Sequence, residues 1–182
     1  SQVASISAEI DGTPGSNDTP GRLVFNTTAQ GGSGQVTERM RITSTGGVHF
    51  NNAELIEKAN IVANKLSAAP TINLDNGMIH HFTTTETTTA TPNITSTAGI
   101  NTNMAVGDAM SVTIVTTAAA AGYAATVTID HLNAGNNGGS LNWTGGSAPS
   151  DGGASGVDIY AYTLIKTADA KFTVIATQTK TS

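Results

Sequence analysis

The chain has 182 residues, a net charge of −5 and only 12% charged residues, about half of the ~25% that soluble domains carry. The acidic balance disfavours nucleic acid as a partner, because phosphate binding needs a basic surface. The absence of cysteine excludes disulfides, thiolate metal ligands and a cysteine nucleophile.

Threonine, serine, asparagine, glycine and alanine replace the missing charged residues. Disordered chains are usually rich in charge, so this composition argues against disorder. Threonine suits a half-buried pleated surface, which favours rigid β-structure. No window approaches the roughly 18 apolar residues of a membrane span. The first residues also lack the pattern of a signal peptide, and we expect no membrane insertion.

Short strands separated by polar loops fill the first part of the chain. Apolar side chains recur at every second residue in 3–10 and again in 22–28, and the turn-forming run 11–21 separates the two strands. A third strand follows at 36–43 and a short fourth one at 48–50. Strands this short bury too little apolar area for an independent domain. Intertwining with identical chains would supply the missing neighbours.

The third strand carries closely spaced charges. Regular alternation places Glu38 and Met40 on one face and Arg39 and Arg41 on the other. Arginine suits buried, two-pronged pairing with carboxylates, and Glu38 or Asp11 of a neighbouring chain is a candidate partner. The alternative is a solvated strand face, where each ion pair contributes little.

Residues 53–70 form a connecting segment between two regions of strands. Helical spacing would align Leu55, Ala59 and Val62, whereas strand spacing divides the same residues between two faces. Two asparagines in this run weaken a helix, so we favour extended structure in its second half. Pro70 ends any helix, and the segment closes there.

From residue 71 to residue 182 the pattern is a series of strands. The Asp-Asn-Gly run at 75–77 predicts a hairpin. The threonine-rich run 83–98 predicts an edge or surface strand because it contains proline. Residues 125–131 show the most regular alternation in the chain, and two long strands at 157–166 and 171–178 close it.

The predicted fold is therefore all-β. Seven or eight strands at roughly ten-residue spacing after residue 71 are typical of a β-sandwich or jelly-roll-like domain. We expect a short-strand region at 1–52, intertwined in a homotrimer, a connecting segment at 53–70, and a β-sandwich domain at 71–182.

Residues 11–25 read DGTPGSNDTPGRLVF, and residues 38–42 read ERMRI. This segment resembles a recurring segment of bacteriophage tail-fibre proteins. The family usually continues with an aspartate and a GNVGIG run, which this chain replaces with TSTGGV at 43–48. Later pieces, among them NGMIH at 76–80 and GGSAPSDGG at 145–153, look like structural proteins of marine cyanophages and related phages.

The resemblance implies a non-enzymatic, homotrimeric fibre subunit of an extracellular phage particle. It implies that 1–52 form a shaft or neck and that 71–182 form a knob that adheres to a host-surface glycan or protein. The other implied partners are virion proteins of the baseplate, tail or capsid. A capsid-attached head fibre or decoration protein is the alternative, and a carbohydrate-binding module is a third possibility. The residues expected at the trimer interface are Asp11, Glu38, Arg39, Met40 and Arg41.

Aromatic and amide side chains beside glycine-rich loops are the candidates for receptor contact, because sugars stack on aromatic faces and hydrogen-bond to Asn and Asp. They are Tyr123, Asn136, Asn137, Trp143 and Asp151. Core packing between the sheets is the alternative role for Trp143, and it is the more common role for a tryptophan.

We expect no catalytic site, no cofactor and no metal. Most carboxylates stand at turns or strand ends, where turn chemistry explains several of them. The sequence contains no Ser-His-Asp arrangement, phosphate loop or zinc motif. His80 and His81 are adjacent in a predicted strand, so their side chains would point to opposite faces and would not share a metal ion.

Overall fold

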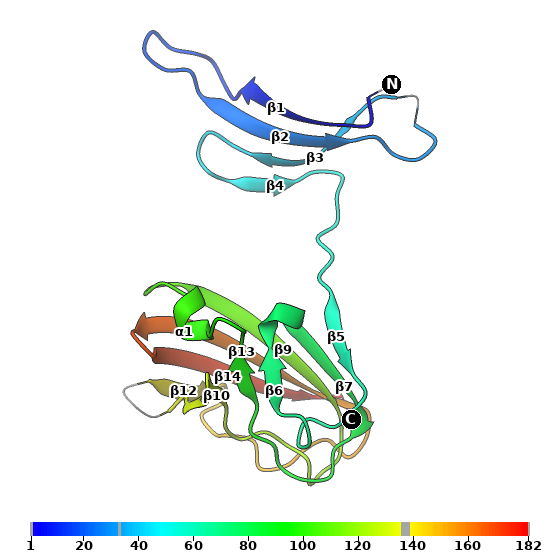
Figure 1. The fold of residues 1–182 in the computed structure, drawn as a ribbon, viewed down its shortest axis with the longest axis vertical. Helices are drawn as coiled ribbons and strands as arrows, with labels where there is room; N and C mark the ends of the chain where they lie inside the picture. The colour runs from blue at the N-terminus through cyan, green and yellow to red at the C-terminus, as the bar shows by residue number, and fades with distance from the viewer. Residues whose placement is uncertain (1, 33, 136–138, 182) are drawn as a thin grey trace. The chain divides into compact units, whose positions relative to one another are not determined.

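The computed structural model describes residues 2–32, 34–135 and 139–181 (Figure 1). The chain divides into two compact units, Ser1–Ile56 and Glu57–Ser182. Almost all of their regular secondary structure is strand, so the all-β prediction is confirmed.

The first unit is a four-stranded antiparallel sheet in which each strand pairs with the next one along the chain. Its strands are β1 (Ala4–Ile10), β2 (Gly21–Thr27), β3 (Thr37–Ile42) and β4 (Val48–Phe50). All four strands were predicted, because each has alternating side chains and is bounded by a run of turn-forming residues. Among the described residues of this unit, Val24 is the only buried hydrophobic one.

The second unit consists of two sheets that enclose one core, with the short strands of the smaller sheet lying along one side of the larger sheet (Figure 1). The larger sheet has the order β12-β14-β13-β9-β7-β5, and the smaller one has the order β11-β10-β8-β6. The strands of the larger sheet are β5 (Ala59–Val62), β7 (Ile79–Thr85), β9 (Ala109–Thr117), β12 (Ser140–Trp143), β13 (Val157–Ala168) and β14 (Lys171–Lys180). Those of the smaller sheet are β6 (Thr71–Asn73), β8 (Asn93–Thr95), β10 (Thr128–Ile129) and β11 (Leu132–Asn133).

The chain winds between these sheets. It passes from β5 to β6, β7, β8, β9 and β10 in turn, changing sheet at each step. As a result β5, β7 and β9 are parallel neighbours in one sheet, and β6, β8 and β10 are parallel neighbours in the other. The short helix α1 (Ile100–Asn103) lies between β8 and β9. The long antiparallel hairpin of β13 and β14 extends the larger sheet beyond β9, as the two long closing strands predicted.

This winding corrects the predicted hairpin at 75–77. The turn is a 3₁₀ helix, η1 (Leu74–Asn76), that leads from β6 in one sheet to β7 in the other. Gly77 has φ 122°, and a Cβ there would lie 2.6 Å from the carbonyl oxygen of Lys58. Glycine at this position therefore allows a close approach to the chain entering β5, rather than a reversal between paired strands.

Two other strand predictions in the second unit are wrong. The threonine-rich run contains the end of β7 and all of β8, and both strands are internal to their sheets. Pro92 only precedes β8, so its missing N–H costs no ladder hydrogen bond. Of the regular run 125–131, only β10 is a strand, because the chain reverses at Asp130 and His131, whose φ values are 48° and 67°. The extended structure predicted for the second half of the connecting segment is confirmed as β5.

Two tyrosines of β13 point into the core side by side and differ in their hydrogen bonding. Tyr160 and Tyr162 are both 1% exposed. The Tyr160 hydroxyl accepts from the backbone N–H of Ala124 at 3.2 Å and from Gln178 Nε2 at 3.1 Å. The Tyr162 hydroxyl is buried without a hydrogen-bond partner among the described residues.

We predict opposite results for phenylalanine at these two positions. Tyr160→Phe leaves a buried N–H unpaired and should cost about 1–2 kcal/mol of unfolding free energy. Tyr162→Phe removes an unpaired hydroxyl and should leave stability unchanged or raise it by up to about 1 kcal/mol. Urea unfolding of both variants measures the difference, and equal losses would contradict this account of the core.

Candidate functional site

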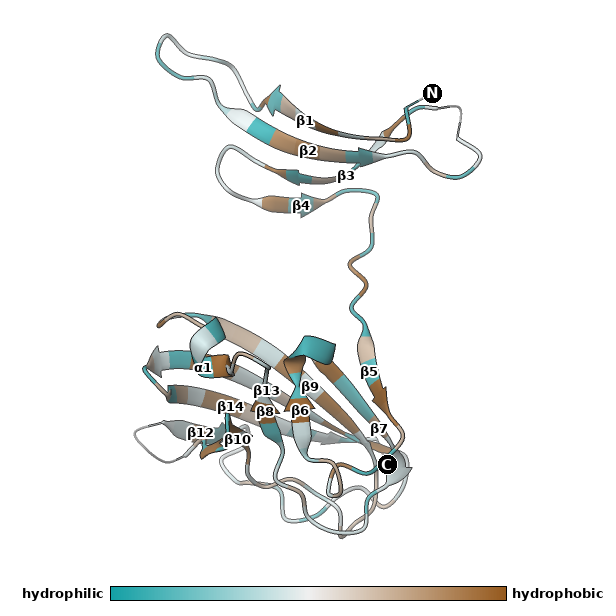
Figure 2. Ribbon diagram, viewed as in Figure 1, coloured by the Kyte–Doolittle hydropathy of each residue, from teal (hydrophilic) through white to brown (hydrophobic). Residues whose placement is uncertain are grey.

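Apolar side chains gather on one face of the first unit's sheet, which we call the apolar face. The strand register aligns them in two cross-strand rows (Ile6, Phe25, Met40 and Phe50; Ala8, Leu23, Ile42 and Val48). Figure 2 shows hydrophobic positions on each of the four strands. Ile6 is 69% exposed, Val48 55% and Phe50 48%. A contiguous exposed apolar surface of this kind marks an interaction site.

A β-bulge at Arg39 changes the predicted arrangement of charges on β3. Phe25 pairs with Met40 and Asn26 with Glu38, so Arg39 has no partner in the ladder. Glu38 therefore lies on the face opposite Met40, where it approaches Arg41 at 3.4 Å. The regular alternation predicted for β3 is wrong, because one extra residue reverses the faces of the side chains before it.

The other face of the sheet is polar. Glu9 on β1 forms a 2.8 Å ion pair with Arg22 on β2, and Arg22 lies 3.6 Å from Asp11. The Asp11 carboxylate accepts from the backbone N–H of Ser44 at 2.8 Å and from its hydroxyl at 3.0 Å. Hydrogen bonds from Arg22 and Ser7 lower the pKa of Glu9, and those from Ser44 lower the pKa of Asp11. These carboxylates hold loop ends together within one chain.

The residues predicted for a trimer interface separate into two groups. Met40 lies on the apolar face, among exposed or half-buried apolar neighbours. Asp11, Glu38, Arg39 and Arg41 each contact a residue of their own chain. Their pairing with a neighbouring chain stays a prediction, and the apolar face is the feature that sequence reasoning underestimated.

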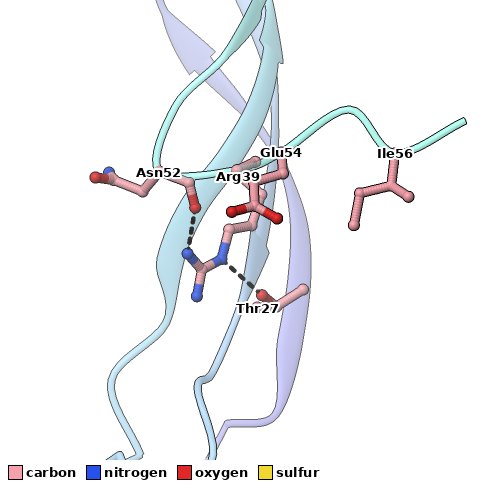
Figure 3. A pocket seen from close by; sticks show the side chains of 6 residues that line it. Thr27, Arg39, Asn52, Glu54 and Ile56 are labelled. Atoms are coloured by element: carbon pink, nitrogen blue, oxygen red, sulfur yellow. Dashed lines mark hydrogen bonds between the residues drawn. The ribbon is translucent and has the colours of Figure 1, made fainter.

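A wide, shallow hollow of about 600 Å³ lies beside Arg39, at the end of the first unit (Figure 3). Arg39 Nε donates to the hydroxyl of Thr27 at 3.0 Å, and its Nη1 donates to the carbonyl oxygen of Asn52. Glu54 and Ile56 complete the rim, and Ile56 is 81% exposed. Through these two hydrogen bonds the Arg39 guanidinium holds the segment that follows β4 in place. Because some of its N–H groups are already bonded within the chain, the hollow does not support an anion site.

The receptor-contact candidates do not form one site. Trp143 packs against the core, edge-on to Tyr162 with 6.2 Å between ring centroids. This is the core-packing role that was the alternative to receptor contact. Tyr123 is half-buried. Asp151 is exposed and forms a 2.7 Å ion pair with Lys180. The two remaining candidates, Asn136 and Asn137, lie outside the described residues.

The adjacent histidines point to opposite faces of β7. His80 is buried, and its ring nitrogens contact Asn60 Nδ2 at 3.1 Å and the carbonyl oxygen of Gly77 at 3.1 Å. Burial lowers the pKa of His80, which favours the neutral imidazole. His81 lies on the other face of the strand. Over the part of the chain that the structure describes, no group of three or more potential metal ligands occurs.

Three charged side chains of the second unit are buried, and sequence reasoning gave none of them a role. Glu86 accepts from the backbone N–H of Leu66, Asp158 accepts from that of Gly153, and Lys166 Nζ donates to the carbonyl oxygens of Asn101 and Met104. Each one satisfies loop backbone that would otherwise be unpaired in the core. The only signal in the sequence was their position, because Asp158 and Lys166 occupy inward-pointing positions of β13. That signal can be recognised only after the structure shows which face of the strand points inward.

Comparison with known proteins adds no relative, because no family model, curated protein or solved structure matches the chain. Among the residues described, no helix is long and apolar enough to cross a membrane.

Proposed function

We propose that this chain is a subunit of a homotrimeric phage virion fibre that adheres to the bacterial host surface without catalysis. One observation carries the proposal. The strands that include the fibre-like segment 11–42 form a single-layer sheet with an exposed apolar face. Assembly of identical subunits would bury that face, which is exposed in a single chain.

The energetics of the first unit support assembly. A single sheet with one buried hydrophobic residue among those described has almost no core of its own. Burial of apolar surface contributes about 25 cal/mol per Å², so covering the apolar face is the largest stabilising contribution available to this unit. The charged contacts of the opposite face lie within one chain and leave the apolar face free for a partner.

Host adhesion is assigned to the second unit. It has a well-packed core and a low content of charge, and its loops include the GGSAPSDGG run that looks like phage virion proteins. Tyr123, Asn136, Asn137 and Asp151 remain the proposed contacts to a glycan or protein receptor, although the described ones do not form a single site. Trp143 would support them from the core rather than touch the receptor.

Two measurements test this proposal. Light scattering on the purified chain should give three times the subunit mass of 18.4 kDa, and a monomer at all concentrations would contradict the trimer. Fluorescently labelled protein should bind saturably to some strains in a panel of marine cyanobacteria and compete with phage adsorption. A trimer that binds no strain susceptible to its phage would contradict the adhesive role.

A capsid-attached head fibre or decoration protein is the second candidate, because the same assembly would serve it. Antibody-labelled electron microscopy of intact virions separates the two. Label on the tail or baseplate supports adhesion, and label confined to the head supports the structural role.

A further inference from the structure

Among the described residues, the outer face of the second unit's larger sheet carries a single charge, that of Lys171 at the start of β14. One side of this sheet packs against the core, and the alternate residues of its strands point away from it. We call these alternate residues the outer face (Ala59, Ile61, Ile79, His81, Thr83, Ala109, Ser111, Thr113, Val115, Thr117, Ser140, Asn142, Val157, Ile159, Ala161, Thr163, Ile165, Lys171, Thr173, Ile175, Thr177 and Thr179). Lys171, at the start of β14, is the one charged residue among these described positions.

The strand register makes this surface continuous. One row crosses five strands through Ile61, His81, Val115, Ile159 and Thr179. The next row contains threonine and aliphatic residues of the same strands. Ile61 is 62% exposed, so its apolar side chain meets solvent in a single chain.

The distribution of charge across β13 is the reverse of that expected for a solvated sheet. A sheet with one wet face usually points polar and charged side chains outward and apolar ones inward. In β13 the two charged residues, Asp158 and Lys166, are both buried on the inner side. The outward positions Val157, Ile159 and Ile165 alternate along the same strand with the buried ones. This pattern is the one that a sheet packed on both faces shows.

The outer face is large enough for a stable interface. Six strands spaced about 4.8 Å apart, with a mean length of nearly eight residues at about 3.3 Å each, span roughly 700–750 Å². A standard protein interface buries about 800 Å² on each partner. A small ligand or a single peptide strand would leave most of this area uncovered.

We propose that the outer faces of the three copies meet around the axis of the trimer, so that each outer face packs against those of the two other copies. This inference rests on the proposed homotrimer and names the surface that holds it together in this unit. Faces whose one charge is a lysine at the end of a strand meet with little like-charge repulsion, whereas a charged partner would lose hydration here with little opposite charge in return. Threonine hydroxyls also find partners in threonines of a facing copy.

The absence of cysteine from the sequence allows a direct test on the full chain. Thr113→Cys places one thiol near the middle of the outer face. The matched control is Thr88→Cys, which places one thiol in an exposed loop between β7 and β8. The measured quantities are the rate of reaction with a maleimide and the products of a short bis-maleimide cross-linker.

We expect the Thr113→Cys thiol to react at least tenfold more slowly than the control in the assembled protein, and to approach its rate on dilution to the dissociated chain. The cross-linker should join its chains to each other but leave those of Thr88→Cys single. An oligomer in which the Thr113→Cys thiol reacts at a rate independent of dilution, without cross-links, would refute this surface and leave the homotrimer intact. A chain that is monomeric throughout would overturn the homotrimer as well.

Because Thr113→Cys only removes one methyl group and exchanges a hydroxyl for a thiol at a half-buried position, the variant should fold, and Thr177→Cys provides a second position. Thr177 lies opposite Ala161, which pairs with Thr113, so it belongs to the same row of the outer face. Protection of both thiols supports the interface. Protection of Thr113→Cys with free reaction of Thr177→Cys would contradict a contact that covers the whole row.

Discussion

Replacing Gly152 with alanine is expected to unfold the second unit or to cost at least about 3 kcal/mol of its stability. A Cβ at this position would lie 2.2 Å from the carbonyl oxygen of Ala119 and 2.8 Å from that of Gly122. It would also lie 2.9 Å from Asp158 Oδ2. Overpacking usually costs about 1–3 kcal/mol, and here the obstructing atoms are mostly backbone and have little room to move.

The loss should be large because this loop is also where a buried carboxylate is satisfied. The N–H of Gly152 donates to the carbonyl oxygen of Ala120 at 2.9 Å, and that of Gly153 donates to Asp158 Oδ2 at 2.9 Å. Asp158 has no exposed surface, so displacing the loop would leave a buried charge with fewer donors. An unpaired charge in a core is among the most costly defects that a substitution can produce.

Gly135→Ala is the matched control for Gly152→Ala. Its added Cβ would make only an ordinary 3.5 Å contact with Asn133 Oδ1, so we expect a change within about 0.5 kcal/mol. Chemical unfolding followed by circular dichroism compares the two variants with the parent chain. Similar midpoints for Gly152→Ala and Gly135→Ala would show that the loop yields, contrary to this account.

The local part of the fold was predictable because local patterns determine it. The strands of the first unit and the hairpin of β13 and β14 pair with their sequence neighbours, and each has alternating side chains bounded by turn residues. The winding between two sheets was not predictable in this way. Its parallel pairs, such as β7 with β9, join strands that are distant in sequence. The two-residue alternation of side chains is the same whichever strand is the partner, so it does not reveal the pairing.

The sequence indicated which residue types form the candidate surfaces, but not how those residues are arranged on the strands. Alternation placed Leu23 and Phe25 on one face of β2, and the apolar face contains both. The bulge at Arg39 left no signal in the sequence, since any of several residues in β3 could have been the extra one. The inward charges Asp158 and Lys166 mark the inner face of β13 only after the buried tyrosines between them are known.

Leu23→Lys should dissociate the assembly, raising the concentration at which half the chains are monomeric by at least about 100-fold. Leu23 lies between Ala8 and Ile42 in one of the two rows of the apolar face and is 37% exposed in one chain. In a single sheet the lysine would extend into water at little cost. In a covered face every subunit would bury an ammonium group without a partner, and each 1.4 kcal/mol of that penalty weakens association about tenfold.

Val3→Lys is the control that separates loss of the apolar face from a general effect of added charge. Val3 is 78% exposed and precedes β1, out of phase with Ile6 and Ala8, so its side chain is not part of the apolar face. Both variants add one positive charge to the same unit, and light scattering over a dilution series compares them. If both weaken association equally, the charge itself is responsible. If neither does, the apolar face is not the surface that identical chains cover, and assembly must rest on the second unit alone.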